Sequence, residues 1–247
     1  MFDGKTIHTL HFTSIDSTSS WAKQHAHEFD PDALTCITAD GQTAGRGQRE
    51  KVWFSPPLGN LYTTFFFVLP RDFPWFVNLG QILALSTANV LKELGFAPSL
   101  KWPNDILLGE KKAGGILSET IVVSDGLAII LGLGMNVNIA PEYLKNIDQP
   151  ATSLVEHSRK PMSLPALVHA LLQKFLLYLQ KLQQTGFCPF AAEYNSYLAY
   201  KGQEVLFSHP EGSFSAICQK IDDLGRLVLE CPDGQERHFC SGSLRKK

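Results

Sequence analysis

Apolar residues recur at three- and four-residue steps in three stretches of the chain, and this spacing predicts three amphipathic helices. They run from about Ser17 to His27, from Phe76 to Leu94, and from Ser163 to just before Gly186. Asp16 or Ser17 is a suitable N-cap for the first helix, and Gly95 closes the second. Each apolar stripe is most simply explained as the face that a helix turns to the core.

Runs rich in β-branched and aromatic residues between these stretches predict strands. The runs are Leu34 to Thr38, Asn60 to Leu69, Leu100 to Trp102, Ile106 to Leu108, Gly115 to Val123, and Leu127 to Asn138. Leu61 to Leu69 is almost wholly apolar or β-branched, which is typical of a strand buried on both faces. Because the strands come in consecutive groups, the pattern predicts an α+β fold with a central mixed sheet covered by helices.

The pattern changes near Leu198, after which short strand candidates are separated by glycine-containing turns. The candidates are Glu204 to Phe207, Phe214 to Ile221, Leu227 to Cys231, and Glu236 to Cys240. Strands of this length predict a small β-barrel. We therefore expect two domains, residues 1–197 and 198–247, with the barrel packed directly on the larger domain.

Composition narrows the class of protein without identifying it. The chain has 247 residues, 44% hydrophobic and 19% charged, with a formal net charge of −2, so no global charge favours DNA or anionic lipid. Its longest apolar stretch is interrupted by polar residues at helical intervals, and we expect no membrane span.

The five cysteines are scattered and form no Cys-x-x-Cys pair. Together with the lack of a signal-peptide pattern, this favours a reduced, cytoplasmic protein. Cys231, His238 and Cys240 lie close together, but their spacing fits no common zinc pattern, and side chains alternating along a strand explain them as well.

A glycine- and arginine-rich loop, Gly41 to Arg49, is the first stretch that suggests chemistry. Glycine lets backbone N–H groups approach a ligand closely, and arginine offers paired donors to phosphate or carboxylate. No Gly-Lys-Ser/Thr follows at P-loop spacing and no helix follows as in a dinucleotide fingerprint. An exposed loop with solvated arginines is the alternative interpretation.

The second stretch runs from Lys101 to Ile106 and continues from Lys111 to Leu117. We expect Lys112 to begin a strand and to project from the end of the sheet. Two glycines then enter an apolar strand, which is easiest to justify if a ligand approaches its backbone; a bulge in an ordinary meander is the alternative. A third stretch, Leu131 to Asn138, places Asn136 and Asn138 on one face of a strand. If these amides are buried, they need hydrogen-bond partners.

Taken together and in this order, the three stretches resemble the biotin–protein ligases. Ser17-Thr18-Ser19 resembles a Ser-Thr-Asn motif of that family, and Gln42 to Arg49 followed by Trp53-Phe54-Ser55-Pro56 resembles its biotin loop. Further matches are Lys101 to Asp105, Lys112 to Glu119, Gly132 to Asn138, and Ala151 to Leu154. The resemblance implies a catalytic domain like that of class II aminoacyl-tRNA synthetases, with a C-terminal SH3-like barrel.

The resemblance also implies a two-step reaction that needs no enzyme nucleophile. Biotin attacks the α-phosphate of ATP to give biotinyl-5′-AMP, and a lysine of a biotin carboxyl carrier domain then takes the biotin. By resemblance the biotin site comprises Ser17, Thr18, Ser19, Gln42, Arg46, Gly47, Gln48, Lys112 and Gly115. Lys112 and Arg46 are expected to be catalytic. The ATP side comprises Arg49, Asn104, Asp105 and Asn136, with Asp105 expected to bind Mg²⁺.

Three positions depart from the family pattern, one of them only mildly. Gln48 stands where some members have arginine, and it cannot neutralise a phosphate. Glu50 stands where glycine is common, and Ser19 in place of asparagine is a milder change. The loop of this protein is therefore less basic than the loop of those family members, and this affects how tightly it can retain the adenylate.

Two other functions fit the same residues less well. A lipoate or octanoate ligase of the same fold could use Lys112 in the same way, and a non-catalytic biotin sensor would bind biotin without activating it. The Ser-Thr motif begins sixteen residues after Met1, so we expect no N-terminal DNA-binding domain and no direct DNA binding. We expect a carrier protein of a biotin-dependent carboxylase as partner, and a possible homodimer through an exposed strand such as Leu127 to Leu133.

Overall fold

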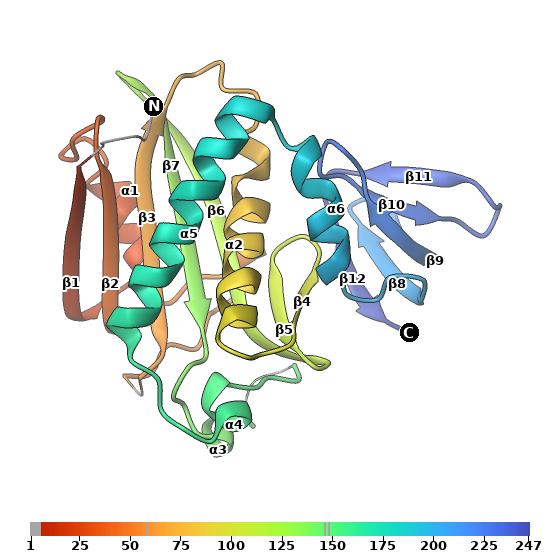
Figure 1. Ribbon diagram of the computed structural model, residues 1–247, viewed down its shortest axis with the longest axis horizontal. Helices are drawn as coiled ribbons and strands as arrows, with labels where there is room; N and C mark the ends of the chain where they lie inside the picture. The colour runs from red at the N-terminus through yellow and green to blue at the C-terminus, as the bar shows by residue number, and fades with distance from the viewer. Residues whose placement is uncertain (1–5, 58, 146, 148) are drawn as a thin grey trace.

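The computed structural model describes residues 6–57, 59–145, 147 and 149–247, with the side chain of Glu50 left out. Two sheets and their helices make up this part of the chain (Figure 1). The larger sheet contains β1 (Ile7–Ile15), β2 (Leu34–Gln42), β3 (Leu61–Leu69), β4 (Pro98–Lys101), β5 (Asp105–Leu108), β6 (Lys111–Val123) and β7 (Gly126–Met135). The smaller sheet contains β8 (Glu204–His209), β9 (Gly212–Ile221), β10 (Leu227–Glu230), β11 (Glu236–Phe239) and β12 (Ser243–Lys246).

The helices lie on both faces of the larger sheet and at its ends (Figure 1). They are α1 (Thr18–Gln24), η1 (Gln48–Glu50), η2 (Phe76–Asn78), α2 (Leu79–Glu93), α3 (Pro141–Leu144), α4 (Leu154–Ser158), α5 (Leu164–Thr185) and α6 (Cys188–Tyr197). Among the described helices none is both long and apolar enough to span a membrane.

The larger sheet has the strand order β1-β2-β3-β7-β6-β5-β4. Only β1 and β2 run parallel; the other neighbours are antiparallel, so the predicted mixed sheet is confirmed. Every residue of β3 is buried, as its apolar composition predicted, because β3 lies between β2 and β7 and is covered on both faces.

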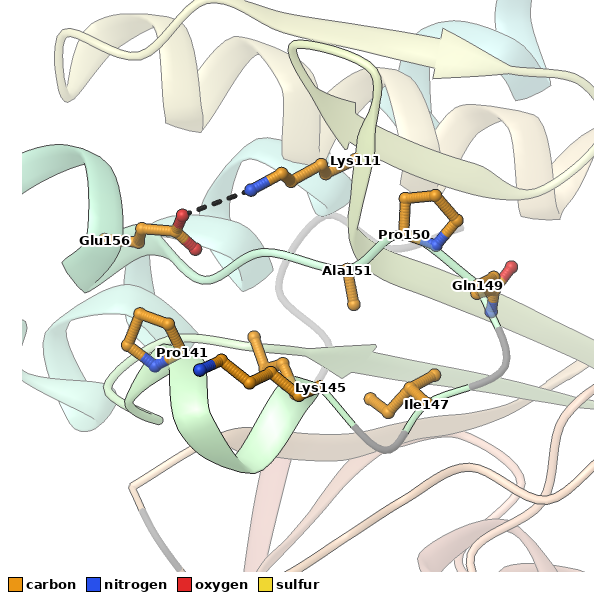
Figure 2. Close-up of a pocket in the computed structure, with 9 residues that line it drawn as sticks. Lys111, Pro141, Lys145, Ile147, Gln149, Pro150, Ala151 and Glu156 are labelled. Carbon is orange, nitrogen blue, oxygen red and sulfur yellow. Dashed lines mark hydrogen bonds and ion pairs between the residues drawn. The ribbon is translucent and has the colours of Figure 1, made fainter.

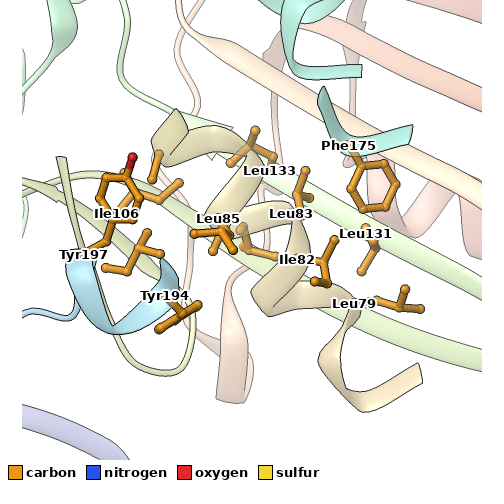
Figure 3. Packing of buried hydrophobic residues seen from close by; sticks show 14 of the residues in the cluster. Leu79, Ile82, Leu83, Leu85, Ile106, Leu131, Leu133, Phe175, Tyr194 and Tyr197 are labelled. Carbon is orange, nitrogen blue, oxygen red and sulfur yellow. The ribbon is translucent and has the colours of Figure 1, made fainter. Parts of the chain in front are cut away.

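The three predicted amphipathic helices are present and pack where their apolar stripes require. Helices α2 and α5 cover one face of the sheet, and α1 covers the other (Figure 1). Figure 3 shows Leu79, Ile82 and Leu83 of α2 in one cluster with Leu131 of β7 and Phe175 of α5. Burying a leucine or isoleucine side chain is worth about 1.5–3 kcal/mol, so this cluster contributes much of the stability of the sheet–helix layer.

The ends of the helices follow local side-chain chemistry. The Ser17 hydroxyl caps α1 by accepting a hydrogen bond from the Ser20 N–H at 3.3 Å. The Ser163 hydroxyl caps α5 by accepting a hydrogen bond from the Ala166 N–H. Gly186 ends that helix with a φ of 71°.

The sequence pattern did not predict β1, α6 or β12, nor the short helices α3 and α4. Strand β1 lies at the edge of the sheet and is mostly exposed, so its residues show no apolar run. Helix α6 has a weak apolar stripe because it is wedged between the larger sheet and the smaller one and is contacted from two sides (Figure 1). Strand β12 lies at the edge of the smaller sheet and buries only one residue, Leu244.

The C-terminal segment forms an antiparallel sheet of order β11-β10-β9-β8-β12. The described pairings do not join β11 to β12, so the expected small barrel is a five-stranded sheet that hydrogen bonds between described strands do not close. Leu198 lies between α6 and β8 and forms an isolated parallel bridge with Leu100 of β4. A domain boundary at residue 198 stays a prediction.

Buried amides attach the smaller sheet to α2. The Asn78 amide donates to the Leu224 carbonyl at 3.0 Å, and the Gln81 amide donates to the Gly225 carbonyl at 2.7 Å. Gly225 has a φ of +82°, and a Cβ atom there would lie under 3.0 Å from both amide side chains. The turn 222–225 therefore needs glycine for both its conformation and its close contact.

One structural expectation about assembly is wrong. Strand β7 was expected to offer an exposed edge at Leu127 to Leu133, but it pairs with β3 on one side and β6 on the other. Its apolar run reflects burial between neighbouring strands, not a dimer surface. Any homodimer would have to use a different surface.

Replacing Gly225 with alanine is predicted to destabilise the fold through the contact with α2. Gly234→Ala is the matched control, because Gly234 also has a positive φ, +77°, but nothing lies within 4 Å of its Cβ position. Both variants incur the backbone strain, of about 1–2 kcal/mol. Gly225→Ala also disturbs the buried amide contacts, and should lose about 1–3 kcal/mol more in urea unfolding. Equal losses in the two variants would contradict this view of the interface.

Candidate functional site

Several polar side chains meet at one end of the larger sheet. The pairing registers bring them there: Leu61 of β3 pairs with Met135 of β7, and Gly115 of β6 lies between Gly134 and Asp105. Gln42 ends β2 at the same end, because β2 is antiparallel to β3. Three stretches far apart in the sequence are thereby brought together.

Both the oxygen and the nitrogen of the Gln42 side-chain amide form hydrogen bonds. Its Oε1 accepts hydrogen bonds from the backbone N–H of Thr18 at 2.9 Å and from the Thr18 hydroxyl at 3.2 Å, and its Nε2 donates to the Ser55 hydroxyl at 2.9 Å. Thr64 donates to the Thr18 hydroxyl at 2.9 Å and lies 3.1 Å from the Ser19 hydroxyl. Ser17, Thr18 and Ser19 are all buried, so α1 begins within a network of oriented polar groups.

Lys112 forms an ion pair with the buried carboxylate of Asp105. Its Nζ lies 2.6 Å from Oδ1 of Asp105, and the Nζ of Lys101 lies 2.7 Å from Oδ2. Burial raises the pKa of Asp105, but the charges of Lys112 and Lys101 outweigh that effect, so the pKa lies below its ordinary value. The carboxylate is therefore ionised, and two ammonium groups share it.

The indole of Trp53 lies flat against two glycines of adjacent strands. A Cβ on Gly134 would lie under 3.0 Å from the Trp53 ring, and one on Gly115 would lie 3.2 Å from it. The Lys112 ammonium is 5.2 Å from the ring centroid, within the range of a cation–π contact. The Trp53 Nε1 atom is buried and has no hydrogen-bond partner among the described residues.

Asn136 and Asn104 are held by backbone groups. Asn136 donates from its side chain to the Thr152 carbonyl at 3.1 Å, and its backbone N–H donates to Ala113 at 2.8 Å. Asn104 donates to the Ile116 carbonyl at 2.8 Å. Thr152 also donates its backbone N–H to the Lys112 carbonyl at 3.0 Å, so the segment after α3 supports both Lys112 and Asn136.

The glycine–arginine loop forms a narrow hairpin. The Trp53 N–H donates to the Gly45 carbonyl at 2.9 Å, the Gly47 N–H donates to Lys51 at 2.7 Å, and Arg46 bridges to Val52. At the tip, Gln48 is half-buried and Arg49 is exposed with a φ of 56°. The side chain of Glu50 lies outside the described part of the structure.

Arg46 points away from Lys112. Its two terminal nitrogens donate to the Glu119 carboxylate of β6 at 2.9 and 3.0 Å, and Lys23 lies 3.4 Å from the same carboxylate. Glu119 is thus the partner of Arg46 in this structure. A contact between Arg46 and a ligand would require the guanidinium to leave Glu119 or to share it.

A cavity of about 300 Å³ opens beside Lys112 and Trp53. Its lining residues are Val52, Trp53, Phe54, Lys112, Asn136, Tyr143, Ile147, Gln149 and Ala151. A second hollow of about 460 Å³ adjoins it and shares Ile147, Gln149 and Ala151. Figure 2 shows the second hollow, with Lys111 reaching Glu156 across its rim at 3.3 Å.

Sequence reasoning placed most of these residues but gave no role to Trp53, Ser55, Lys101 or Glu119. All four residues lie within motifs that resemble those of the family, but their burial and their side-chain partners cannot be seen in the sequence pattern. The alternation of residues along β6 predicts only that Glu119 lies on a polar face. Its pairing with Arg46 becomes visible only when β6 and the loop pack together in the fold.

The comparisons with known proteins agree with this geometry. The profile of the biotin/lipoate A/B protein ligase family matches residues 11–136, slightly more than half of the chain. The bifunctional ligase/repressor BirA of Bacillus spizizenii is 31% identical over 241 residues, which cover 94% of this chain and 72% of the relative. The biotin–[acetyl-CoA-carboxylase] ligase of Paracoccus denitrificans is 27% identical over 230 residues, which cover 90% of this chain and 93% of that enzyme.

Solved structures show the same relationship. The biotin protein ligase of Aquifex aeolicus, in complex with biotin and ATP, superposes with a TM-score of 0.83 and 30% identity, covering 97% of this chain and 99% of that one. The family profile, the relatives and the fold therefore agree, and the chain belongs to the biotin/lipoate A/B protein ligase family.

Proposed function

We propose that this protein is an ATP-dependent biotin–protein ligase that forms biotinyl-5′-AMP and passes biotin to a lysine of a carrier domain. The observation that carries the proposal is the position of Lys112. Its ammonium lines the 300 Å³ cavity together with Trp53 and Asn136 and pairs with a buried carboxylate. The similar Aquifex aeolicus protein was solved with biotin and ATP, which supports the same pair of ligands here.

The first step joins two anions. An oxygen of the biotin carboxylate attacks the α-phosphorus of ATP, and pyrophosphate leaves with the electron pair of the broken P–O bond. Lys112 would stabilise the negative charge shared by the carboxylate and the α-phosphate. In the second step a carrier lysine amine attacks the biotinyl carbonyl, AMP leaves, and the amine loses a proton.

The remaining residues would bind and orient the two substrates. We assign the ring of biotin to the polar network of Ser17, Thr18, Ser19 and Gln42, with Arg46, Gly47, Gln48 and Gly115 beside it. Arg49, Asn104, Asp105 and Asn136 are assigned to the ATP side. A flat ligand can lie on the glycine-containing strands β6 and β7 only where no Cβ intervenes, and Trp53 lies against those glycines. The Trp53 indole would have to move aside for such a ligand. Alternatively, the indole would cover the ligand and keep water from the anhydride.

Magnesium is the expected companion of ATP, but the described side chains do not form a site for it. Both carboxylate oxygens of Asp105 are occupied by ammonium groups at 2.6 and 2.7 Å, and the described residues contain no group of three or more acidic, His or Cys side chains. Mg²⁺ usually relies on substrate phosphates and waters for most of its ligands. Coordination by Asp105 stays a prediction, and it would require a lysine to leave.

The partner we propose is the carrier domain of a biotin-dependent carboxylase, because relatives such as the Paracoccus denitrificans enzyme are named for acetyl-CoA carboxylase. A cytoplasmic location and a homodimer also remain proposals.

The acid specificity tests this function directly. Purified protein is incubated with ATP, a carrier domain and either labelled biotin or labelled lipoate. We expect biotin to be incorporated and lipoate to give only background label. Incorporation of lipoate alone would assign the chain to the lipoate branch, and biotin binding without pyrophosphate exchange would favour a sensor.

Lys112→Met is predicted to lower biotin-dependent ATP–pyrophosphate exchange by about 10²-fold or more, because it removes a charge that stabilises the transition state. Lys111→Met is the matched control: Lys111 is the preceding residue, is half exposed, and pairs with Glu156 outside the reacting centre. We expect the control to retain exchange close to that of the wild type. Exchange at the wild-type level in Lys112→Met would refute the role of Lys112.

Gln48→Arg is predicted to slow release of the adenylate. Glutamine donates a hydrogen bond without charge, whereas arginine adds a charge-assisted contact worth about 1.5–3 kcal/mol. Preformed labelled adenylate should therefore dissociate at least several-fold more slowly from the variant in a filter assay. A release rate equal to that of the wild type would show that residue 48 does not contact the phosphate.

A further inference from the structure

The carboxylate of Asp105 is shared by two lysines, and only one of them belongs to the site cavity. Lys112 contacts Oδ1 and lines the cavity, whereas Lys101 contacts Oδ2 and is not among the described residues that line it. All three side chains are largely buried, with exposed fractions of 10% for Asp105, 16% for Lys112 and 20% for Lys101. The group therefore carries one net positive charge in a poorly solvated place.

The second lysine matters because Lys112 has two tasks that exclude each other. It cannot neutralise Asp105 fully while it also faces the carboxylate and phosphate of the substrates. If Lys112 were the only cation, its departure would leave a buried carboxylate unpaired, which is strongly unfavourable. With Lys101 in place, Asp105 keeps one partner at 2.7 Å throughout.

Lys101 is fixed in a position that suits this task. It lies directly opposite Asp105 in the β4–β5 pairing, so its side chain reaches the carboxylate across a short hairpin. The preceding residue, Leu100, is fully buried, and its carbonyl accepts a hydrogen bond from the Ala199 N–H at 2.9 Å. The edge strand that carries Lys101 is therefore held by the segment that leads into the smaller sheet.

We propose that Lys101 is a positioning residue: it neutralises Asp105 when Lys112 turns from that carboxylate to the ligand. This inference rests on the proposed ligase function and on the assignment of Lys112 within it. The same role gives Asp105, which the resemblance suggested as a metal ligand, a function toward Lys112. Asp105 holds Lys112 in the unliganded protein and releases it at low cost because a second cation remains.

The proposal predicts a specific defect for Lys101→Met. Asp105 then has Lys112 as its only cation, so Lys112 leaves it less readily, and kcat for biotin-dependent exchange should fall about tenfold or more. KM for biotin should change much less, because Lys101 is not among the described residues that line the cavity. Lys101→Arg retains the charge and should restore most of kcat. Lys174→Met, which removes the ion pair between α5 and Glu93 of α2 and leaves Asp105 untouched, serves as the control and should match the wild type.

A double-mutant cycle with Asp105→Asn separates this role from a direct one. Without the carboxylate there is no charge for Lys101 to neutralise, so adding Lys101→Met to Asp105→Asn should change kcat by less than about twofold. The same tenfold loss in both backgrounds would mean that Lys101 acts on the ligand itself, and would overturn the proposal. So would wild-type kcat in Lys101→Met, or failure of Lys101→Arg to restore it.

Folding and function are checked separately in the same experiment. Urea unfolding of each variant shows whether a lost rate reflects lost structure, and a rate defect that Lys101→Arg rescues at unchanged stability cannot be structural. If the wild type itself shows no exchange with biotin, the proposed function fails. If the wild type exchanges and Lys101→Met does so equally well, only the inference about Lys101 fails.

Discussion

The buried carboxylate of Asp105 is the constraint on which the site depends. An ionised carboxylate on a side chain that is only 10% exposed cannot remain unpaired, and it holds two lysine ammonium groups within 2.7 Å. Those contacts fix the start of β6 and the end of β4, and through Lys112 they fix one wall of the cavity. The attachment of β4 to the segment before β8 extends the same arrangement to the smaller sheet.

The rest of the site follows from the end of the sheet where these groups lie. Strands β6 and β7 bring Gly115 and Gly134 side by side, and the missing side chains leave a flat surface that the Trp53 indole occupies. The loop that carries Trp53 is closed on itself by backbone hydrogen bonds and is anchored to β6 through Arg46 and Glu119. Strands of the larger sheet thus carry the charged groups and the glycines of the site. The hairpin loop carries the Trp53 indole, which lies over those glycines.

Periodicity predicted the long helices and the buried strands correctly, because each of them turns a continuous apolar face to the core. It failed for the edge strands β1 and β12, which bury few residues, for the short helices α3 and α4, and for α6, which is contacted from two sides. The motifs singled out Gln42, Lys112 and Asn136, which lie at one end of the larger sheet, while their roles stay predictions. Side-chain partners could not be predicted in the same way: Arg46 pairs with Glu119 across 73 positions, and Lys101 lies opposite Asp105 only because β4 and β5 form a hairpin.

The most direct test of the central claim is a crystal structure of the protein with biotin and a non-hydrolysable ATP analogue. The account predicts that the Lys112 ammonium lies within hydrogen-bonding distance of both the biotin carboxylate and the α-phosphate. It also predicts that the ring of biotin lies beside Gln42, and that Lys101 still contacts Asp105. A structure in which both ligands bind while Lys112 remains on Asp105, away from the reacting atoms, would contradict it.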